Sequence, residues 1–512
     1  MRNFFLCFLA AFCSPALAQQ VTGSILGGVQ DAQGAAIAGA DVTARNGDTG
    51  FSRMAQSNQR GEYRIEFLPP GNYELQVSSK GFRSFVASGI TLAVGQFARV
   101  DAHLEVGDAA SAIQVEGSAP LVNTTDATVG QTVGTDQITT LPLVNRNIYS
   151  LLTLTPGVQN TGNAIALGFP AQRTFINGGA DATMGSVNYY LDGGPNMSTL
   201  RNTGNITPNP DAIEEFRVDT NNYSAEYGRF GNGVINVITR SGTNQFHGSA
   251  FEFLRNTALN ANTWNAITKP PLHRNQFGGA VGGPIVRNKT FFFGTYSGLR
   301  QATTTFLNSA VVPTSAQRAG NFSALSKPVL DPQTGNPFPG NIVPPQRFDP
   351  TALNLVDKYI PLANRPNNIF QGQVPSPYNT DEYMLKIDHM LSDSQRLTVS
   401  YFTTAGNNSI QPGGNLPWSV QAYNWRQQNA NANYTWTLTP NLVNQSWLSL
   451  TRYFGGRTNL PALSLHDLGS DFKPQGPSAL PNIAVTGYFT LGQSIAGPVA
   501  GDSLYTLRDV AS

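Results

Sequence analysis

One stretch of the sequence, residues 213–242, divides the chain into two parts of different character. It begins with a charged segment, passes through a turn broken by Gly231 and Gly233, and ends in the largely β-branched run Val234–Ile238. Glycine allows close backbone approach, and β-branched residues favour strands. After Gly242, aromatic-rich segments alternate with loops rich in Asn, Gly and Pro up to the end of the chain. The stretch therefore marks a domain boundary.

The composition limits the classes of protein to which the chain can belong. A length of 512 residues suggests roughly two to four domains. Charged residues make up 12% of the chain, and 32 basic residues are balanced by 31 acidic ones, so nothing favours a nucleic-acid partner. The 51 glycines and 33 prolines indicate a turn-rich chain, while 10% aromatic residues are too many for a disordered one.

The first residues predict the compartment. Arg2 supplies a short positive region, Phe4–Phe12 is an apolar run, and Ala16-Leu17-Ala18 fits a cleavage site. We therefore expect a secretory signal peptide at residues 1–18. The alternative is a lipoprotein signal acylated at Cys13, but Phe12 is too large for the position before such a cysteine.

The cysteines and the hydropathy exclude further classes. Both cysteines, Cys7 and Cys13, lie inside the predicted signal peptide. The mature chain would then have no disulfide, no thiolate metal site and no cysteine nucleophile. No later run of about 18 apolar residues occurs, so we expect no transmembrane helix. If the chain spans a membrane, it does so as a β-barrel.

Residues 19–106 show the pattern of a small β-sandwich, with strands separated by turn signals. Residues 62–67 and 72–77 alternate apolar with polar side chains, and we expect the turn at 68–71 to join them as antiparallel strands. The sequences of Gly23–Val29 and Leu68–Leu75 resemble those of the carboxypeptidase regulatory-like domain, a transthyretin-like sandwich. Related folds bind starch, so carbohydrate binding and a spacer role both remain open.

The resemblance does not imply peptidase activity. Zinc peptidases need a His-x-x-Glu pair, because three protein ligands leave one zinc position open. None of the five histidines begins such a pair. No nucleophile–base pair or paired carboxylates stand out either, so we expect no enzyme, no catalytic residue, no metal and no cofactor.

Residues 107–120 are small and polar and indicate a linker, within which five residues form a short alternating segment: Ile113, Gln114, Val115, Glu116 and Gly117. Residues 121–242 carry a series of motifs that resembles, in order and spacing, the α+β plug domain of TonB-dependent outer-membrane receptors. The motif residues are Leu141, Pro142, Arg146, Asn147, Pro156, Gly157, Asp192, Gly193, Glu214, Glu215, Phe216, Glu226, Tyr227 and Gly228.

The resemblance implies roles for some of these residues. The segment Ile113–Gly117 lies where such receptors recruit TonB by strand addition, although ordinary strand pairing explains it equally well. The charged residues of the plug predict a solvated or ion-paired surface, with direct ligand contact as the alternative. They are Asp192, Glu214, Glu215, Arg217 and Glu226. A surface rich in Gly, Asn and Thr would allow exchangeable hydrogen bonds to a barrel wall.

Residues 243–512 repeat hairpin-sized units with aromatic residues, typical of outer-membrane β-barrels, although a soluble β-sandwich would look similar. Residues 303–382 are rich in Pro, Asn and Ser and predict one long extracellular loop. Receptors of this family close a 22-stranded barrel, for which this segment is too short, and the chain ends without a closing aromatic strand. We therefore expect a fragment that carries only the first part of the barrel.

Together these patterns predict a mainly β protein in the outer membrane of a Gram-negative bacterium. The leading hypothesis is a TonB-dependent receptor that imports an unidentified substrate, carbohydrate being one candidate, when TonB and its inner-membrane complex pull on the plug. Its other partner would be outer-membrane lipid. The alternative is a non-transporting adhesin or a carbohydrate-binding surface protein, and an enzyme is the third hypothesis.

Overall fold

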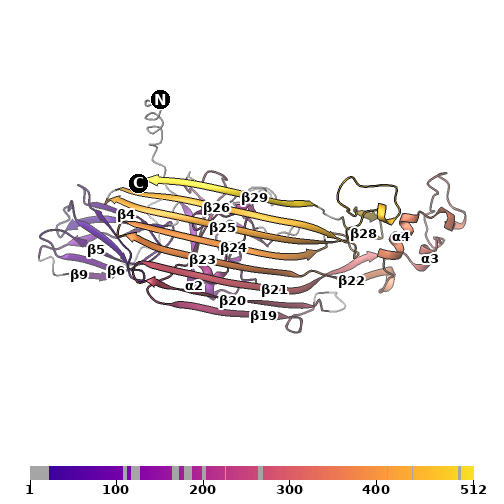
Figure 1. The fold of residues 1–512 in the computed structure, drawn as a ribbon, viewed down its shortest axis with the longest axis horizontal. Helices are drawn as coiled ribbons and strands as arrows, with labels where there is room; N and C mark the ends of the chain where they lie inside the picture. Colours follow the sequence, from indigo (N-terminus) through magenta and orange to yellow (C-terminus); the bar gives the residue numbers. More distant parts are fainter. Residues whose placement is uncertain are drawn as a thin grey trace, which may run out of the picture.

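The computed structural model describes residues 22–107, 112–116, 127–143, 145–163, 172–177, 187–198, 203–224, 227–262, 264, 269–411, 413–440, 442–493 and 497–511. The predicted signal peptide, Gly117 and Glu226 lie outside these residues. The described fold is mostly β. A small sandwich lies at one end of a long antiparallel sheet, a plug lies against one face of that sheet, and helices α3 and α4 lie at its other end (Figure 1).

The sandwich packs two sheets around one core. The first sheet contains β4 (Glu62–Leu68), β1 (Gly23–Asp31) and β7 (Phe97–Arg99) in that order, with β8 (Ala102–Leu104) also pairing with β1. The second contains β3 (Ser52–Gln56), β2 (Asp41–Asn46), β5 (Gly71–Ser78), β6 (Ser84–Leu92) and β9 (Ala112–Glu116). The alternating residues Ile65, Tyr73 and Leu75 are buried between the sheets, as the period of two requires.

Two features of the sandwich differ from the prediction. Residues 62–67 and 72–77 form strands, but the expected hairpin is wrong, because β4 pairs with β1 whereas β5 pairs with β2 and β6. Positive φ angles of 57° at Phe67 and 143° at Gly71 turn the chain from one sheet to the other. The predicted linker also contains a strand, since β9 runs parallel to β6 and extends its sheet.

The plug is an α+β unit with two small sheets. The first has the order β10 (Val129–Gly134), β17 (Ile213–Asn221), β18 (Val234–Thr239), β13 (Asn188–Leu191) and β14 (Gly194–Pro195). The second has the order β11 (Val158–Asn163), β12 (Gln172–Ile176), β16 (Thr203–Gly204) and β15 (Met197–Ser198). The described residues of the plug also form the short helices α2 (Thr135–Thr140), η1 (Ile148–Leu154) and η3 (Pro210–Ala212). Every residue of β18 is buried, which explains its β-branched composition.

The long sheet follows the chain order: β19 (His247–Asn256), β20 (Leu272–Val286), β21 (Thr290–Val311), β23 (Tyr378–Ser392), β24 (Gln395–Ile410), β25 (Val420–Thr439), β26 (Leu442–Leu460) and β29 (Gly497–Ala511). Strand β22 (Ile369–Pro375) pairs with the outer part of β21. Within the described residues the sheet is open, with β19 and β29 at its two ends. Antiparallel pairing of β23 with β24 and of β25 with β26 confirms the hairpin-sized units predicted for residues 243–512.

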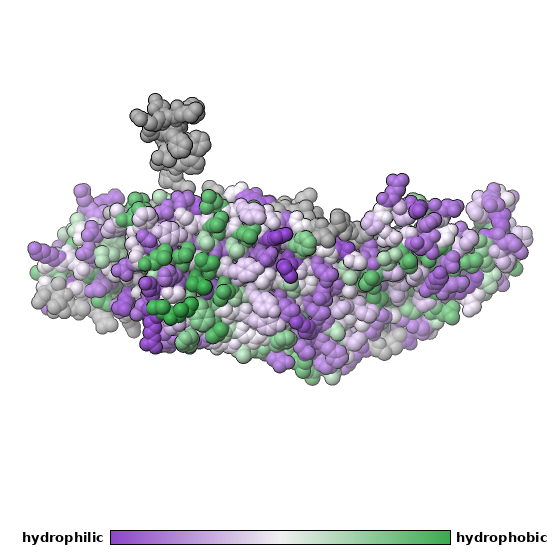
Figure 2. Space-filling view, in the orientation of Figure 1, coloured by the Kyte–Doolittle hydropathy of each residue, from purple (hydrophilic) through white to green (hydrophobic). Residues whose placement is uncertain are grey.

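The two faces of this sheet differ in polarity. On the outer face, Ile387, Val399 and Leu448 are 36%, 42% and 57% exposed. On the inner face, Lys386 and Ser400, which are paired across β23 and β24, are 6% and 5% exposed. Figure 2 shows apolar side chains gathered on the visible face of the sheet toward the sandwich. Apolar outside and polar inside is the alternation of a membrane barrel wall.

The predicted single loop over 303–382 is wrong. Strand β21 continues to Val311, and the residues beyond it fold with two later segments into a cap that has its own core, including Val312, Ile360, Trp418 and Leu491. Apolar residues scattered among the turns explain this, because together they bury a core that no single window of the sequence reveals.

The cap contains most of the remaining short elements. They are α3 (Ser315–Arg318), η5 (Pro339–Asn341), η6 (Pro345–Arg347), α4 (Pro350–Tyr359), η7 (Pro366–Asn368), η8 (His466–Leu468), β27 (Ile483–Val485) and β28 (Phe489–Leu491). The short helix η4 (Thr257–Leu259) lies outside the cap, after β19. Arg318 donates hydrogen bonds to the carbonyls of Val356 and Ile360 and so caps α4. Among the described residues, no helix is long and apolar enough to cross a membrane.

The core of the sandwich gives a stability prediction. Leu75 is fully buried, so Leu75→Ala should lower the local unfolding free energy of the sandwich by about 2–5 kcal/mol. Its neighbour Glu74 is exposed, so Glu74→Ala should cost less than about 0.5 kcal/mol. Native-state hydrogen exchange of the β2 and β5 amides would measure both. Equal effects of the two substitutions would contradict the assigned core.

Candidate functional site

The plug meets the barrel wall through a seam of amide side chains. Alternate residues of β25 face inward, and this places Gln427, Asn429 and Asn431 on the face that contacts the plug. Gln427 accepts from the N–H of Ile206 and donates to its carbonyl, each at 2.9 Å. Asn429 and Asn431 donate to plug carbonyls at 3.1 Å. The wall therefore bonds mainly to the backbone of the plug at this strand.

A smaller part of the seam is apolar. Phe293, Met384 and Phe402 of the wall belong to the same buried cluster as Phe216 and Val237 of the plug. The plug surface is thus polar around a limited apolar contact, rather than polar throughout as the composition predicts.

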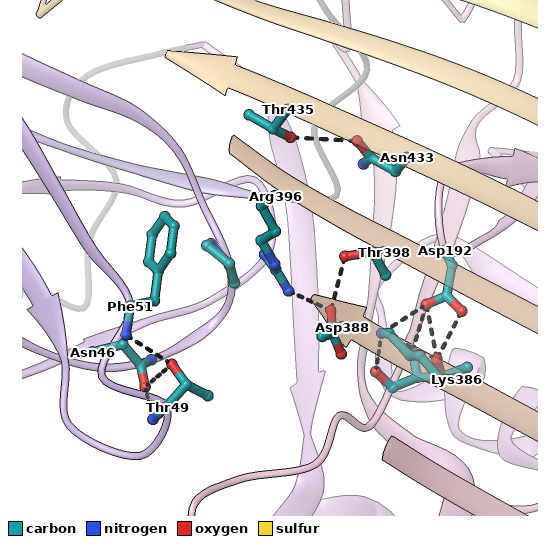
Figure 3. Close-up of polar contacts among 12 residues, drawn as sticks. Asn46, Thr49, Phe51, Asp192, Lys386, Asp388, Arg396, Thr398, Asn433 and Thr435 are labelled. Atoms are coloured by element: carbon teal, nitrogen blue, oxygen red, sulfur yellow. Dashed lines mark hydrogen bonds and ion pairs between the residues drawn. The ribbon is translucent and has the colours of Figure 1, made fainter. Parts of the chain in front are cut away.

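A buried ion pair joins the plug to the wall near the sandwich (Figure 3). Asp192, in the turn after β13, accepts from the N–H of Thr239 at 3.0 Å and from its hydroxyl at 2.7 Å. The ammonium of Lys386 lies 3.5 Å from the same carboxylate and donates to the carbonyl of Thr239 at 2.9 Å. The side chains of Lys386 and Asp192 are only 7% and 8% exposed. Both charges are paired and hydrogen-bonded, as burial requires.

A second ion pair lies beside the first on the wall. The Asp388 carboxylate accepts from Arg396 at 2.6 Å and from Thr398 at 2.8 Å. The Arg396 guanidinium lies 5.8 Å from the ring centre of Phe51 in the sandwich (Figure 3). Residues of the sandwich, the plug and the wall together line a cavity of about 180 Å³ at this point. The two ion pairs therefore mark the junction of all three parts.

Another polar cavity, of about 270 Å³, lies between plug loops and the wall, nearer the cap. Arg146, Arg274, Tyr378 and Glu382 are among its lining residues. Arg274 donates to the Asn145 side chain at 2.7 Å, which ties the plug loop to β20. Charged and amide side chains, among them Arg274, Gln276 and Glu382, line this cavity.

The outer plug loop is also anchored by a cationic side chain. Arg146 forms an ion pair with Asp211, and its guanidinium lies 4.1 and 4.5 Å from the ring centres of Phe251 and Phe253 on β19. Cation–π contacts of this kind stabilise a partly buried arginine. Burial lowers the pKa of Arg146, while the Asp211 carboxylate raises it.

The sandwich contacts the plug at Glu215. This residue is 7% exposed, and its carboxylate accepts a hydrogen bond from the N–H of Val94 in the sandwich. Burial raises the pKa of Glu215 to about 7, an effect that the Val94 hydrogen bond opposes and the neighbouring Glu214 charge reinforces. Arg217, which is paired with Asp219 at 2.7 Å, slightly opposes the shift.

The structure spreads the predicted motif residues over the plug. Leu141 and Pro142 are exposed after α2, Arg146 and Asn147 precede η1, and Pro156 and Gly157 are exposed before β11. Asp192 and Gly193 form the buried turn after β13; Glu214 is exposed on β17, whereas Glu215 and Phe216 are buried there. Tyr227 packs on Tyr190 and Gly228 is exposed. Among these described residues, Asp192 forms the buried ion pair, and Glu214 lines the cavity beside it.

The predicted solvated or ion-paired surface holds for Asp192 in its ion-paired form, since Asp192 pairs with Lys386. It is wrong for Glu215, which is buried against the sandwich and accepts a hydrogen bond from Val94. Sequence reasoning missed Lys386, the partner of Asp192, and Val94, the partner of Glu215. It also missed the wall amides that bond to the plug backbone, Gln427, Asn429 and Asn431. The phase of the alternation in β25 could have placed the three amides on one face. Among the described residues, no group of three or more His, Asp or Glu side chains could hold a metal ion.

Residues 238–512 match the family described as outer membrane beta barrel domain, which covers more than half of the chain. The chain belongs to this family. Residues 24–105 match the carboxypeptidase regulatory-like domain, which confirms the predicted sandwich. The family supports an outer-membrane location for this barrel chain and confirms the mainly β fold predicted from the sequence.

The barrel chain is also similar to known receptors. It is 30% identical to the TonB-dependent transporter Oar of Myxococcus xanthus over 305 residues, which are 56% of this chain and 27% of that relative. The chain thus spans about a quarter of the relative's length. This similarity confirms the resemblance to TonB-dependent outer-membrane receptors that the motifs indicate. Solved structures similar to it include the siderophore receptor PirA of Acinetobacter baumannii (14% identity, TM-score 0.40, 74% of this chain and 44% of that one). They also include the ferric preacinetobactin receptor BauA of Acinetobacter baumannii (11% identity, TM-score 0.38, 76% of this chain and 55% of that one).

The buried ion pair predicts a large cost for losing one charge. Lys386→Met should lower the free energy of plug opening by about 3–5 kcal/mol, because Asp192 stays buried without its cation. Adding Asp192→Asn should recover part of the loss. Hydrogen exchange of the β13 and β18 amides would measure these values. As a control, Arg60→Ala at the exposed Arg60–Glu62 pair should cost at most about 1 kcal/mol.

The contact at Glu215 predicts a pH dependence. Because burial raises its pKa from 4.5 to about 7, the docked sandwich is most stable below pH 4.5 and loses this stability as the pH rises through 7. The charged groups that face it are Glu214 and Arg217. Glu215→Gln, which keeps the acceptor without the charge, should remove the dependence. The measurement is hydrogen exchange of the Val94 amide as a function of pH, corrected for the intrinsic pH dependence of exchange. A protection factor that does not change with pH in the unsubstituted protein would contradict the prediction.

Proposed function

We propose that the chain works as a plug-gated, TonB-dependent receptor of the outer membrane. Substrate would bind on the outer side, and the plug would shift when TonB, energised from the inner membrane, pulls on it. One observation carries the proposal. A separately folded plug is held against the inner face of an outer-membrane barrel sheet mainly by polar, exchangeable contacts, such as those of Gln427 and Asn431.

The strength of these contacts suits a gate. A hydrogen bond between neutral groups contributes only about 0.5–1.5 kcal/mol, because water replaces it when it breaks. Apolar burial would bind the plug more tightly, at about 25 cal/mol per Å². The apolar part of the seam is confined to few wall residues, among them Phe293 and Phe402. A pull applied to the plug could thus break the seam stepwise.

The substrate end of the proposed receptor is the cavity near the cap. It combines Arg146, Arg274 and Glu382 with amide side chains, a mixture that favours a polar ligand. The substrate itself is unidentified, and carbohydrate is one candidate. The outer apolar row, including Val399 and Leu448, would contact outer-membrane lipid, and the signal peptide at residues 1–18 would direct export.

The proposed TonB contact is the segment Ile113–Gly117. Residues 113–116 of this segment belong to β9, which among the described residues lies at one end of the sandwich sheet and is paired with β6. A strand at the end of a sheet can receive a further strand on its free side. This position fits recruitment of TonB by strand addition.

A crosslink tests this function. Glutamine 114 lies in β9, so Gln114→Cys should form a disulfide with a cysteine-substituted TonB in outer membranes of a Gram-negative host. Gln76→Cys is the control, because Gln76 is exposed in the same sandwich but lies on the central strand β5. The readout is the shifted band on a non-reducing gel. Equal trapping at both positions, or none at Gln114→Cys, would count against TonB recruitment here.

A further inference from the structure

Among the described residues, the sandwich packs against two hairpin turns of the wall and faces a third across a groove. Gly50 packs on Asn288 in the β20–β21 turn, and Met390, before the β23–β24 turn, packs against the sandwich core. Val443, after the β25–β26 turn, lines a groove together with Met54 of the sandwich. These turns lie at the end of the sheet opposite α3 and α4 (Figure 1). The sandwich therefore lies across one end of the plug–wall seam.

Near the contact of Gly50 with Asn288, a series of hydrogen bonds links the sandwich to the connection between plug and barrel. Asn244, in the connection between β18 and β19, donates from its backbone N–H to the carbonyl of Asp48 at 3.0 Å. Its side chain and Asn288 exchange two hydrogen bonds of 2.8 Å. One asparagine thus joins the sandwich, the connection and the wall.

The sandwich also binds the plug itself, on a different side. The Val94 N–H donates to Glu215 on β17, and Gly95 lies against the Arg217 side chain. A Cβ at Gly95 would lie only 3.2 Å from the Cδ of Arg217, so the two surfaces are closely apposed. The Asp192–Lys386 pair and the cavity of about 180 Å³ lie between this contact and the wall contacts.

We propose that the sandwich is a clasp, which closes the inner end of the seam by holding both the plug and the wall and must detach before the plug can shift. This inference rests on the proposed function and adds its regulation. The strand proposed to bind TonB, β9, is paired with β6 of the sandwich. A pull on β9 is therefore transmitted to the clasp before it reaches the buried ion pair.

The composition of the contact fits a reversible clasp. The contacts that hold the sandwich include single hydrogen bonds at Asn244 and Glu215 and the apolar side chain of Met390, which packs on its core. Arg396 beside Phe51 and the close approaches at Gly50 and Gly95 add to them. Each such bond is individually small. The raised pKa of Glu215 adds a second control, since the uncharged acid is the form that burial favours.

A disulfide tests the clasp without TonB or substrate. A Cβ on Gly50 would lie 3.5 Å from the Cβ of Asn288, within the span of a disulfide, and the only two cysteines of the chain are Cys7 and Cys13. In Gly50→Cys/Asn288→Cys, oxidation should slow exchange of the Val94 amide and of the β18 amides by about tenfold relative to the same protein after reduction. The reduced protein is the matched control. Slower exchange at Val94 without any change in β18 would overturn the proposal.

Gly50 and Asn288 both have positive φ, so strain can prevent the disulfide. In that case a second variant tests the clasp. Glu215→Ala removes the plug contact and should speed exchange of the distant Asn244 amide by about tenfold, since a clasp opens as one unit. The Asn288 amide, which bonds to the Asn244 side chain, should not change, and Glu215→Gln should restore protection. An unchanged Asn244 amide in Glu215→Ala would show that the contacts act separately and would overturn the clasp.

These outcomes are independent of the TonB crosslink. If β18 and Asn244 do not respond while Gln114→Cys still traps TonB, the clasp is wrong and the proposed function stands. If they respond while no crosslink forms, the clasp holds as a feature of the fold and the proposed function fails.

Discussion

The structure depends on satisfying buried polar groups where the plug meets the wall. The inner face of the sheet carries Lys386, Asn429 and Asn431, none of which tolerates burial without partners. The plug supplies them with backbone carbonyls and with the Asp192 carboxylate. A mainly polar seam of this kind specifies where the plug sits and still lets water replace its bonds, so that position and mobility come from the same interactions.

The two ends of the seam differ in chemistry. Near the cap, the plug loop at Asn145 and Arg146 borders a polar cavity with Arg274 and Glu382. At the other end, the sandwich covers the junction where Asp192 meets Lys386. A polar cavity at one end and a domain lying across the other give the molecule a direction, as the receptor function proposed above requires.

Much of the fold follows from local pattern. Hairpin-sized units predict the strands of the wall, and alternation predicts the strands of the sandwich, because burial of one face imposes a period of two. Pairing between strands is less local. The expected hairpin of β4 and β5 is wrong because either strand can bury its apolar face from either sheet, and only the bend from Phe67 to Gly71 decides between them.

The sequence by itself determined the class of protein: the mainly β architecture, the sandwich, the plug motifs and the barrel family, all of which depend on periodicity and motif order. Only the tertiary structure decided which polar residues act together. Asp192 and Lys386 are 194 positions apart in the chain, much farther than the length of any sequence motif, yet their charged groups lie 3.5 Å apart. The burial of Glu215 likewise comes from Val94 in another domain. Such contacts form when domains dock, and docking depends on matched surfaces rather than on local propensity.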